Sequence, residues 1–323
     1  MNQNDMGQMA QPDSFSGAFS RSGLRIGPVV ALRAGPLVAE RAMPGTELPG
    51  AYTQFSIKPI SPTIGAEVSG VRISGAIEPA VLEELRRALL EWKVLFFHDQ
   101  DITRQEHKGF AARWGSLEPQ NPYKAAFNGQ EDGDLANFMG GSENIWHNDV
   151  TWLKAPTFAA VLRAVEIPDV GGDTLWSDTG AAYDLLPEEL QLRVNSLVAE
   201  HDWAHNSGLS EAQIATLRPY CPPAEHPVVR LIPETGRRVL FVNRIFTKRI
   251  VGLSDTQSAE LLDALYQHMN RAEFQVRLRW RKNTIAMWDN RTCQHYAASD
   301  YSPKKRVMER VSIAGNEPIG INK

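Results

Sequence analysis

The stretch WHNDVTW, residues 146–152, places a histidine and an aspartate two positions apart. On an extended segment, side chains two residues apart point to the same side, so His147 and Asp149 can present their ligand atoms together. A third ligand is available far downstream, because the stretch WDNRTCQHY, residues 288–296, contains His295. Two imidazoles and one carboxylate leave three coordination positions open, as in non-heme ferrous oxygenases. The sequence therefore predicts a metal site formed by these three residues.

The composition is that of an ordinary soluble globular protein. Of the 323 residues, 42% are hydrophobic and 22% are charged, and the net charge of −4 argues against a nucleic-acid binder. Cys221 and Cys293 are too few for a disulfide framework and form no CxxC pair, so we expect a reducing, cytoplasmic location. No apolar run approaches the roughly 20 residues of a membrane helix, and the N-terminus lacks the features of a secretory signal.

Residues 1–54 differ in composition from the rest of the chain. They are rich in Met, Gln, Ser and Gly, and Gly and Pro interrupt their short apolar pieces, so we expect a disordered N-terminal extension. Its arginines and few acids leave two alternatives open, an organelle-targeting segment and a misassigned start codon. We expect residues 55–323 to form a single domain.

Short extended segments dominate the remainder. Alternating hydrophobicity predicts strands at 55–60 and 66–71, and a helix from Pro79 to Trp92 precedes a buried strand at 93–97. Capping-box spacing predicts two more helices, after Thr103 and after Ser254. Other apolar segments lie at 158–165, 228–232, 239–242, 274–280, 284–288 and 307–313. This pattern indicates a mainly β fold, a sandwich or barrel with helices outside. The chain shows no βαβ alternation that would support a parallel sheet.

Two arginines follow the second histidine motif. The turn-like residues 300–303 predict a hairpin whose return strand carries Arg306 and Arg310 near the metal end. Four residues apart on a strand, both face the same side, and each guanidinium fork suits a carboxylate or sulfonate. The alternative is that both face solvent on an edge strand, and the periodicity of this segment does not decide between the two.

Several separated stretches together resemble the taurine/2,4-D dioxygenase (TauD/TfdA) family of ferrous, 2-oxoglutarate-dependent oxygenases. The resemblance runs from about Phe55 to the C-terminus, and its motifs are WHNDVTW (146–152), GGDTLW (171–176), HPVVR (226–230), FVN (241–243) and WDNRTCQHYA (288–297). It implies a double-stranded β-helix (jelly-roll, cupin-like) core. It also implies that His147, Asp149 and His295 hold Fe(II), and that Thr174 and Arg306 bind the distal carboxylate of 2-oxoglutarate. O2 takes the last metal position.

The resemblance also implies the reaction. Oxidative decarboxylation of 2-oxoglutarate to succinate and CO2 accompanies hydroxylation of a carbon next to a heteroatom. The carboxylate of Asp149 favours hydroxylation over halogenation. In taurine-oxidising members an arginine at the position of Arg310 holds the sulfonate, so a small anionic organosulfur substrate is implied, giving sulfite and an aldehyde. Alkyl sulfate esters and aryloxyalkanoic acids are the alternative substrates.

The resemblance also implies candidate substrate contacts, at some of which this chain departs from the taurine-oxidising members. Tyr123 and Phe246 fall where the family lines its substrate pocket, although simple core packing explains each equally well. Gln120 replaces a substrate-touching histidine of the taurine-oxidising members. Glu143 replaces an asparagine, and it can either pair with a substrate amine or remain solvated. Ser207 replaces a pocket phenylalanine, and the prolines at 219, 222 and 223 suggest a fixed loop in place of a long lid helix.

Four further interpretations remain open at this point. A lone HxD is often a structural pair, and Thr174 can be an ordinary strand residue after a glycine turn. A structural zinc site would need a fourth protein ligand, for which Cys293 is the one candidate. A non-catalytic metal- or anion-binding β-barrel is the alternative from a different functional class.

We expect the partner to be a small anionic molecule and the protein to be a homo-oligomer, a dimer or tetramer, without nucleic-acid or membrane binding.

Overall fold

The computed structural model describes Ile26 and residues 52–118, 136–139, 144–205, 207, 210–219 and 221–321. Most of the predicted extension 1–54 lies outside these residues, as do Gln120, Tyr123 and Glu143. At the start of the described chain, the backbone N–H groups of Thr53 and Gln54 donate to the carboxylate of Glu84.

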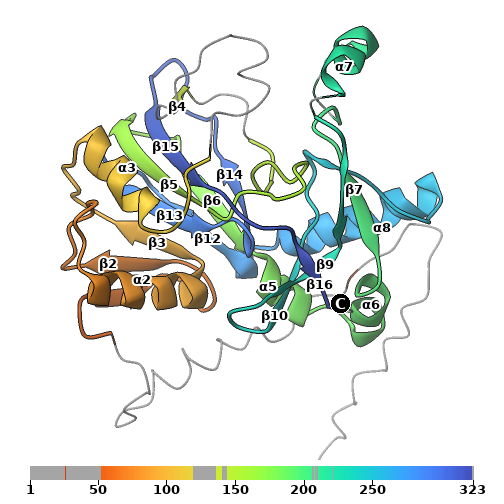
Figure 1. Ribbon diagram of the computed structural model, residues 1–323, viewed down its shortest axis with the longest axis horizontal. Helices are drawn as coiled ribbons and strands as arrows, with labels where there is room; N and C mark the ends of the chain where they lie inside the picture. Colours follow the sequence, from red (N-terminus) through yellow and green to blue (C-terminus); the bar gives the residue numbers. More distant parts are fainter. Residues whose placement is uncertain are drawn as a thin grey trace, which may run out of the picture.

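A seven-stranded sheet forms one half of the core (Figure 1). All its neighbouring strands are antiparallel except one pair. In spatial order its strands are β1 (Ser56–Pro59), β2 (Ala66–Ser69), β3 (Val94–Phe97), β13 (Ile285–Asp289), β5 (Ala159–Glu166), β15 (Val307–Ile313) and β4 (Ala136–Met139).

A smaller antiparallel sheet packs against the inner face of this large sheet. Its strands, in order, are β12 (Gln275–Leu278), β6 (Thr174–Asp178) and β14 (Cys293–Ala297). Trp176 of the small sheet and Trp288 and Met308 of the large sheet belong to one buried hydrophobic cluster between the two. Side chains of both inner faces therefore form a sandwich core, and the site predicted from the sequence lies on strands that border it.

Two more three-stranded sheets complete the β structure. One contains β10 (Arg237–Leu240), β9 (Val229–Ile232) and β16 (Ile319–Gly320), and the other contains β11 (Thr247–Ile250), β7 (Val198–His201) and β8 (Ala224–Pro227). They share a hydrophobic cluster with α5 (Thr179–Asp184), α6 (Glu188–Val194), α8 (Asp255–Met269) and the 3-10 turn η1 (Ala272–Phe274). The carbonyl of Ile26 accepts a hydrogen bond from Arg271, just after α8, at 2.7 Å.

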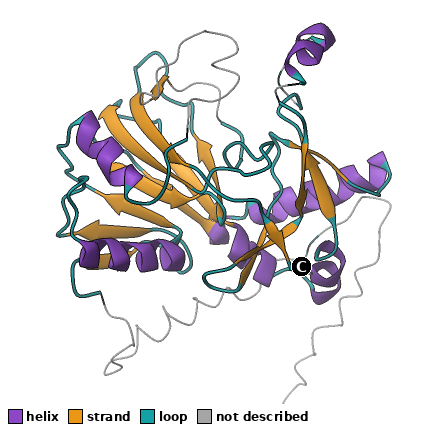
Figure 2. Ribbon diagram, in the orientation of Figure 1, coloured by secondary structure: helices purple, strands orange, loops and turns teal. Residues whose placement is uncertain are grey.

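Helices lie outside the sheets, as Figure 2 shows. The outer face of the large sheet is covered by α2 (Pro79–Trp92) and α3 (Arg104–Ala112). Pro79 begins α2, and both hydrogen bonds of a capping box join Thr103 and Glu106 at the start of α3. Ser254 and Gln257 form the same box at α8, so both capping predictions are confirmed.

Three features differ from the sequence-based expectation. Strands β2 and β3 are parallel, with α2 as the crossover between them, so one βαβ unit is present after all. The predicted hairpin at 300–303 is wrong, because β14 pairs in the small sheet whereas β15 pairs in the large sheet. The chain crosses from the small sheet to the large sheet at this point. There Asp300 accepts the Gly172 N–H at 2.8 Å, which attaches the connection to the 171–172 turn. The segment with three prolines contains a short helix, α7 (Glu211–Leu217), which ends before Pro219.

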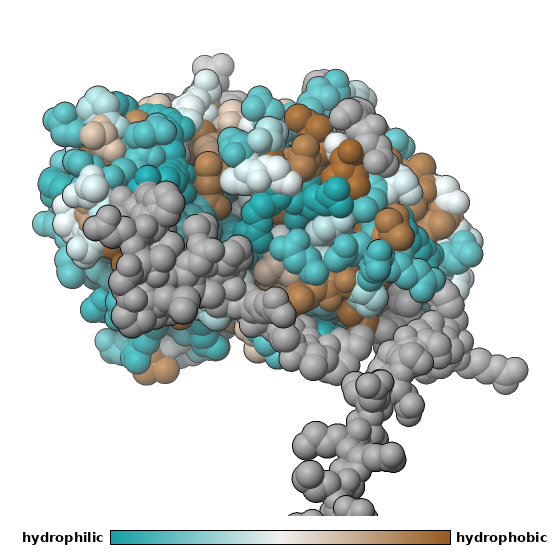
Figure 3. Space-filling model, turned by 90° about the horizontal axis from the view of Figure 1, so that it is seen from below, coloured by the Kyte–Doolittle hydropathy of each residue, from teal (hydrophilic) through white to brown (hydrophobic). Residues whose placement is uncertain are grey.

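The surface offers scattered hydrophobic residues. Figure 3 shows one face on which hydrophilic residues surround separate hydrophobic groups. Large exposed hydrophobic side chains among the described residues come from separate segments of the chain, namely Ile60, Ile145, Val170, Leu192 and Ile319. None of the helices in the described part of the chain has the length and apolar character needed to cross a membrane.

Candidate metal centre and co-substrate site

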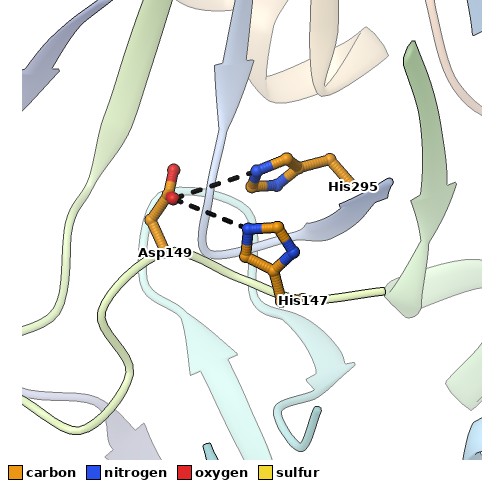
Figure 4. A group of neighbouring side chains, drawn as sticks. All are labelled: His147, Asp149 and His295. Carbon is orange, nitrogen blue, oxygen red and sulfur yellow. Dashed lines mark ion pairs between the residues drawn. The ribbon is translucent and has the colours of Figure 1, made fainter. Parts of the chain in front are cut away.

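The three predicted metal ligands lie together at one end of the sandwich (Figure 4). One ligand atom from each of His147, Asp149 and His295 lies within 4.8 Å of the other two. Asp149 Oδ1 is 3.9 Å from His147 Nε2 and 3.8 Å from His295 Nε2. All three side chains are buried. The structure thus brings together His147 and His295, which are almost 150 positions apart in the sequence.

Backbone pairing and two asparagines hold this arrangement. His147 and His295 exchange both backbone hydrogen bonds, at 3.0 and 2.8 Å, across an isolated antiparallel bridge. The Asn148 amide donates to the carbonyls of Asn290 and Cys293. Asn290 in turn accepts the Asp149 N–H at 2.7 Å and donates to the Asp149 carbonyl. Sequence reasoning assigned no role to Asn148 or Asn290, which clamp the HxD segment to the turn before His295.

The protonation states suit a metal donor set. His147 Nδ1 donates to the Ile145 carbonyl at 2.7 Å, which leaves the Nε2 lone pair directed at the group. Burial lowers the pKa of His147, and burial together with the neighbouring imidazole lowers the pKa of His295 to about 3. Burial alone would raise the pKa of Asp149, but Arg310 and the two histidines outweigh it and lower the pKa to about 2. At neutral pH the group therefore offers two neutral imidazoles and a carboxylate.

The donor set fits Fe(II) better than structural zinc. Asp149 Oδ2 is buried and has no hydrogen-bond partner among the described residues, so it remains available to an ion. No fourth His, Cys, Asp or Glu joins the group in the described part of the chain. The Cys293 thiol donates instead to the Asp289 carbonyl at 3.3 Å. A structural zinc site would close its fourth position with a protein ligand, whereas two histidines and one carboxylate are the donor set of non-heme iron.

Thr174 and Arg306, the predicted 2-oxoglutarate residues, are also in contact. Thr174 begins β6, and its register places it on the same face as Trp176, the cross-strand partner of His295. The Thr174 hydroxyl oxygen accepts from Arg306 Nη2 at 3.1 Å and from Trp280 Nε1 at 2.9 Å. With both lone pairs used, the Thr174 O–H can only donate. A buried guanidinium and a hydroxyl donor side by side fit a carboxylate.

The glycine turn before Thr174 makes room for Arg306. Gly172 has φ +72°, and a Cβ there would lie 2.9 Å from Arg306 Cδ and 3.3 Å from Tyr301 Cδ1. Backbone in this region is unfavourable for residues with side chains, so glycine is required for two independent reasons.

We expect Gly172→Ala to weaken 2-oxoglutarate binding by displacing Arg306, in addition to a backbone cost of about 1–3 kcal/mol. The matched control is Gly252→Ala, since Gly252 has φ +81° but a Cβ added there would meet no atom of the described residues within 4 Å. Denaturant unfolding should show a loss of stability for both variants, and the KM for 2-oxoglutarate should rise only for Gly172→Ala. An equal KM in the two variants would contradict the proposed displacement.

The predicted substrate residues have different outcomes. Arg310 lies on β15, and its Nη1 donates to Asp149 Oδ1 at 2.8 Å, so both arginines reach the site and the solvent-facing alternative is wrong. Phe246 is buried and packs with Trp152 and Trp203 in a separate hydrophobic cluster. Ser207 is exposed. Gln120, Tyr123 and Glu143 lie outside the described residues.

Glu118 is an acidic neighbour of the site that sequence reasoning missed. Its carboxylate accepts the Thr157 hydroxyl at 2.7 Å. Burial raises the pKa of Glu118 to about 7, with a further increase from Asp149 and an opposing effect from Arg310. Leu117 pairs with Ile313 at the end of β15, which brings Glu118 to the face that carries Arg310. No local pattern reveals this, because the pairing joins segments far apart in the chain.

Comparisons with known proteins agree with this geometry. A family model described as taurine catabolism dioxygenase TauD, TfdA family, matches residues 56–312. An alpha-ketoglutarate-dependent sulfate ester dioxygenase of Pseudomonas putida is 37% identical over 286 residues, covering 83% of this chain and 92% of the relative. An alkylsulfatase of Acinetobacter baylyi is 35% identical over 277 residues, covering 83% and 87%. The crystal structure of a taurine dioxygenase from Burkholderia xenovorans superimposes with a TM-score of 0.73 at 33% identity, covering 84% of this chain and 94% of that chain.

These similarities extend over most of the described part of the chain. The mainly β fold with a jelly-roll core is confirmed, and the alternative of a non-catalytic β-barrel is wrong. The chain belongs to the TauD/TfdA family and is a 2-oxoglutarate-dependent dioxygenase that uses Fe(II) and O2.

Proposed function

We propose that His147, Asp149 and His295 hold the iron and that Thr174 and Arg306 bind the distal carboxylate of 2-oxoglutarate. Convergence of the three buried donor atoms within 4.8 Å supports the first assignment. The contact of Arg306 with the Thr174 hydroxyl, on the same sheet face as His295, supports the second. When bound, iron and 2-oxoglutarate with O2 supply the oxidation that replaces a substrate C–H by C–OH.

Within the site, the residues of this chain orient the groups that would bind iron and 2-oxoglutarate. His147 would bind the metal through Nε2, because its Nδ1 proton is held by the Ile145 carbonyl at 2.7 Å. Arg306 stands over the ring of Trp280, with its guanidinium carbon 5.9 Å from the ring centroid, so the guanidinium plane is restrained before a carboxylate arrives. Pre-orientation of this kind reduces the entropy that co-substrate binding costs.

We propose that the substrate is a small organosulfur anion whose sulfur group binds Arg310. The observation that carries this is the distance of 2.8 Å between Arg310 Nη1 and Asp149 Oδ1. An anion held by this guanidinium would place its neighbouring carbon beside the metal group. The sulfate-ester relatives favour alkyl sulfates over the taurine-like sulfonates implied by the sequence motifs. Aryloxyalkanoates carry a carboxylate that the Arg310 guanidinium can also bind, and they are the alternative substrate class.

The two organosulfur classes give different inorganic products. Hydroxylation of the carbon in R–CH2–OSO3⁻ gives R–CH(OH)–OSO3⁻, which loses hydrogen sulfate and leaves an aldehyde. The same step on R–CH2–SO3⁻ gives an aldehyde and hydrogen sulfite. In each case one 2-oxoglutarate and one O2 yield one succinate and one CO2. Assays with a matched pair, an alkyl sulfate and the alkyl sulfonate of equal chain length, followed by ion chromatography, distinguish them. Sulfate release in step with succinate supports the proposal, and succinate release without either sulfur product contradicts it.

Replacing Arg310 with alanine is expected to lower kcat/KM for the anionic substrate by at least about 30-fold, since loss of a partly buried arginine that pairs with the buried Asp149 costs at least about 2 kcal/mol. Iron and 2-oxoglutarate binding should be retained. Arg163→Ala is the matched control, because Arg163 lies on the neighbouring strand β5 and pairs with Glu309. Steady-state kinetics measure the loss. Wild-type turnover in Arg310→Ala would show that another group anchors the anion.

We also propose a cytoplasmic location, which is supported by the two buried free thiols, Cys221 and Cys293. The proposed dimer or tetramer is tested by sedimentation of the purified protein, and a monomer at working concentration would contradict it.

A further inference from the structure

The backbone after Asp149 adopts a conformation that its side chain disfavours. Val150 has φ +44°, in the left-handed region. This region is uncommon for any residue except glycine, and it is an outlier for a β-branched residue. Such a conformation persists only where surrounding contacts enforce it, so the neighbours of Val150 must hold the chain in place.

Thr151, the next residue, provides these contacts. It is buried, and its hydroxyl lies 2.9 Å from Asn243 Nδ2 and 2.9 Å from His201 Nδ1. Its carbonyl accepts from His226 Nε2 at 2.9 Å. Three side chains from separate parts of the fold therefore converge on one residue: His201 at the end of β7, His226 within β8 and Asn243 in the connection between β10 and β11.

His226 is fixed as a donor. Its Nε2 proton is shared between two carbonyl acceptors, those of Thr151 and Leu153, at 2.9 and 3.0 Å. Burial lowers the pKa of His226 to about 4, so the imidazole is neutral at physiological pH and carries this proton on Nε2. The chain on both sides of Trp152 is thereby attached to β8.

Asn243 extends the same network to the other side of the site. Its Oδ1 accepts the backbone N–H groups of Ile245 and Phe246, at 3.1 and 2.9 Å, and its carbonyl accepts the Tyr266 hydroxyl. The Asn243 side chain thus links the Thr151 hydroxyl directly to the turn that carries Phe246. Phe246 also packs in one hydrophobic cluster with Trp152.

We propose that Thr151 is a positioning residue, which holds the strained turn after Asp149 and, through Asn243, joins the metal carboxylate to the Phe246 turn as one rigid unit. Replacing Thr151 should then disturb metal binding and substrate binding together. This inference rests on the proposed function, because it takes Asp149 as an iron ligand. It also takes Phe246 as part of the substrate side, as the family resemblance implies.

The test uses Thr151→Val, which keeps the shape and removes the hydroxyl, and Thr151→Ser, which retains the hydroxyl. Thr284→Val is the matched control, since Thr284 is also buried and its hydroxyl lies 3.2 Å from His98 Nδ1. Thr284 directly precedes β13 and His98 directly follows β3, so this pair is separate from the metal group. Affinity for Mn(II) is measured by calorimetry on the full chain, and KM values are measured separately for the anionic substrate and for 2-oxoglutarate.

We expect Thr151→Val to weaken Mn(II) binding by about 10-fold or more, in line with the loss of other outer contacts of metal ligands. The KM for the anionic substrate should rise while the KM for 2-oxoglutarate stays near its wild-type value. Thr151→Ser and Thr284→Val should bind metal like the wild type. Because glycine removes the strain, Val150→Gly should restore part of the metal affinity when it is combined with Thr151→Val. Wild-type affinity in Thr151→Val would overturn the inference.

If Thr151→Val fails to fold, Asn243→Ala tests the same link, because it removes both the donor to Thr151 and the acceptor for Ile245 and Phe246. An unchanged Mn(II) affinity in that variant would again overturn the inference. The proposed function and the role of Thr151 fail differently. Absence of metal binding in the wild type contradicts the proposed function, whereas wild-type metal binding that none of the network variants alters contradicts the role of Thr151 alone.

Discussion

Replacing His295 with alanine is expected to abolish succinate formation and to weaken Fe(II) binding by more than about 100-fold. Loss of a mere outer contact of a metal ligand costs about 10- to 100-fold in affinity, and removal of one of three ligands must cost more. The two remaining donors, His147 and Asp149, would leave the ion held mainly by water. Binding is measured by anaerobic titration with Fe(II), and turnover by succinate release.

His107→Ala is the matched control for this variant. His107 is also a fully buried histidine with a single ring contact, to the Val161 carbonyl at 3.2 Å, but it lies on α3 at the outer face of the large sheet. Both variants should lose stability through the cavity that a missing ring leaves. Only His295→Ala should lose iron. Equal iron affinity in the two variants would remove His295 from the ligand set.

Replacing Arg306 with leucine is expected to raise the Kd for 2-oxoglutarate by at least about 30-fold, and up to about 4,000-fold, from the 2–5 kcal/mol that a buried charge partner contributes. Arg306 is buried and holds the Thr174 hydroxyl, so its loss removes the charge and also frees the hydroxyl to rotate. Arg306→Lys should recover only part of the affinity, because a point charge lacks the fork that binds both carboxylate oxygens.

Arg277→Leu controls for loss of a nearby arginine. Arg277 lies on β12 and pairs with Asp173 at 2.6 Å, with its side chain half exposed. Iron affinity should be unchanged in both variants, which separates co-substrate binding from metal binding. If Arg306→Leu keeps the wild-type Kd, the distal carboxylate of 2-oxoglutarate binds elsewhere.

Local patterns predicted several helices and strands, and the convergence of His147 and Asp149, for physical reasons. His147 and Asp149 are two residues apart, so extended backbone alone places them on one side. Capping boxes at Thr103 and Ser254 are satisfied within one helical turn, and they required no tertiary information. His295 could be selected because its motif is recognisable, although nothing local showed that its backbone pairs with that of His147.

Long-range pairing explains what the sequence did not reveal. The turn at 300–303 has ordinary hairpin residues, yet Asp300 binds the 171–172 turn and directs the chain into the other sheet. The two strands and the helix of the parallel β2–β3 pair were predicted, but their pairing was not, because which strands become neighbours is decided by tertiary packing. Glu118 lies in none of the recognised motifs. Thr151 and Asn243 lie within motifs, but nothing local reveals their role, which arises from hydrogen bonds to segments distant in the chain.

The central claim is that one buried group holds iron and 2-oxoglutarate together. Anaerobic addition of Fe(II) and 2-oxoglutarate to the full chain tests it most directly, through the visible metal-to-ligand charge-transfer absorption that appears when a keto acid chelates ferrous iron. We predict that the band forms only when both components are present, that it is lost in His295→Ala, and that Arg306→Leu needs far more 2-oxoglutarate to produce it. A folded wild-type protein that gives no band at saturating Fe(II) and 2-oxoglutarate would contradict the claim.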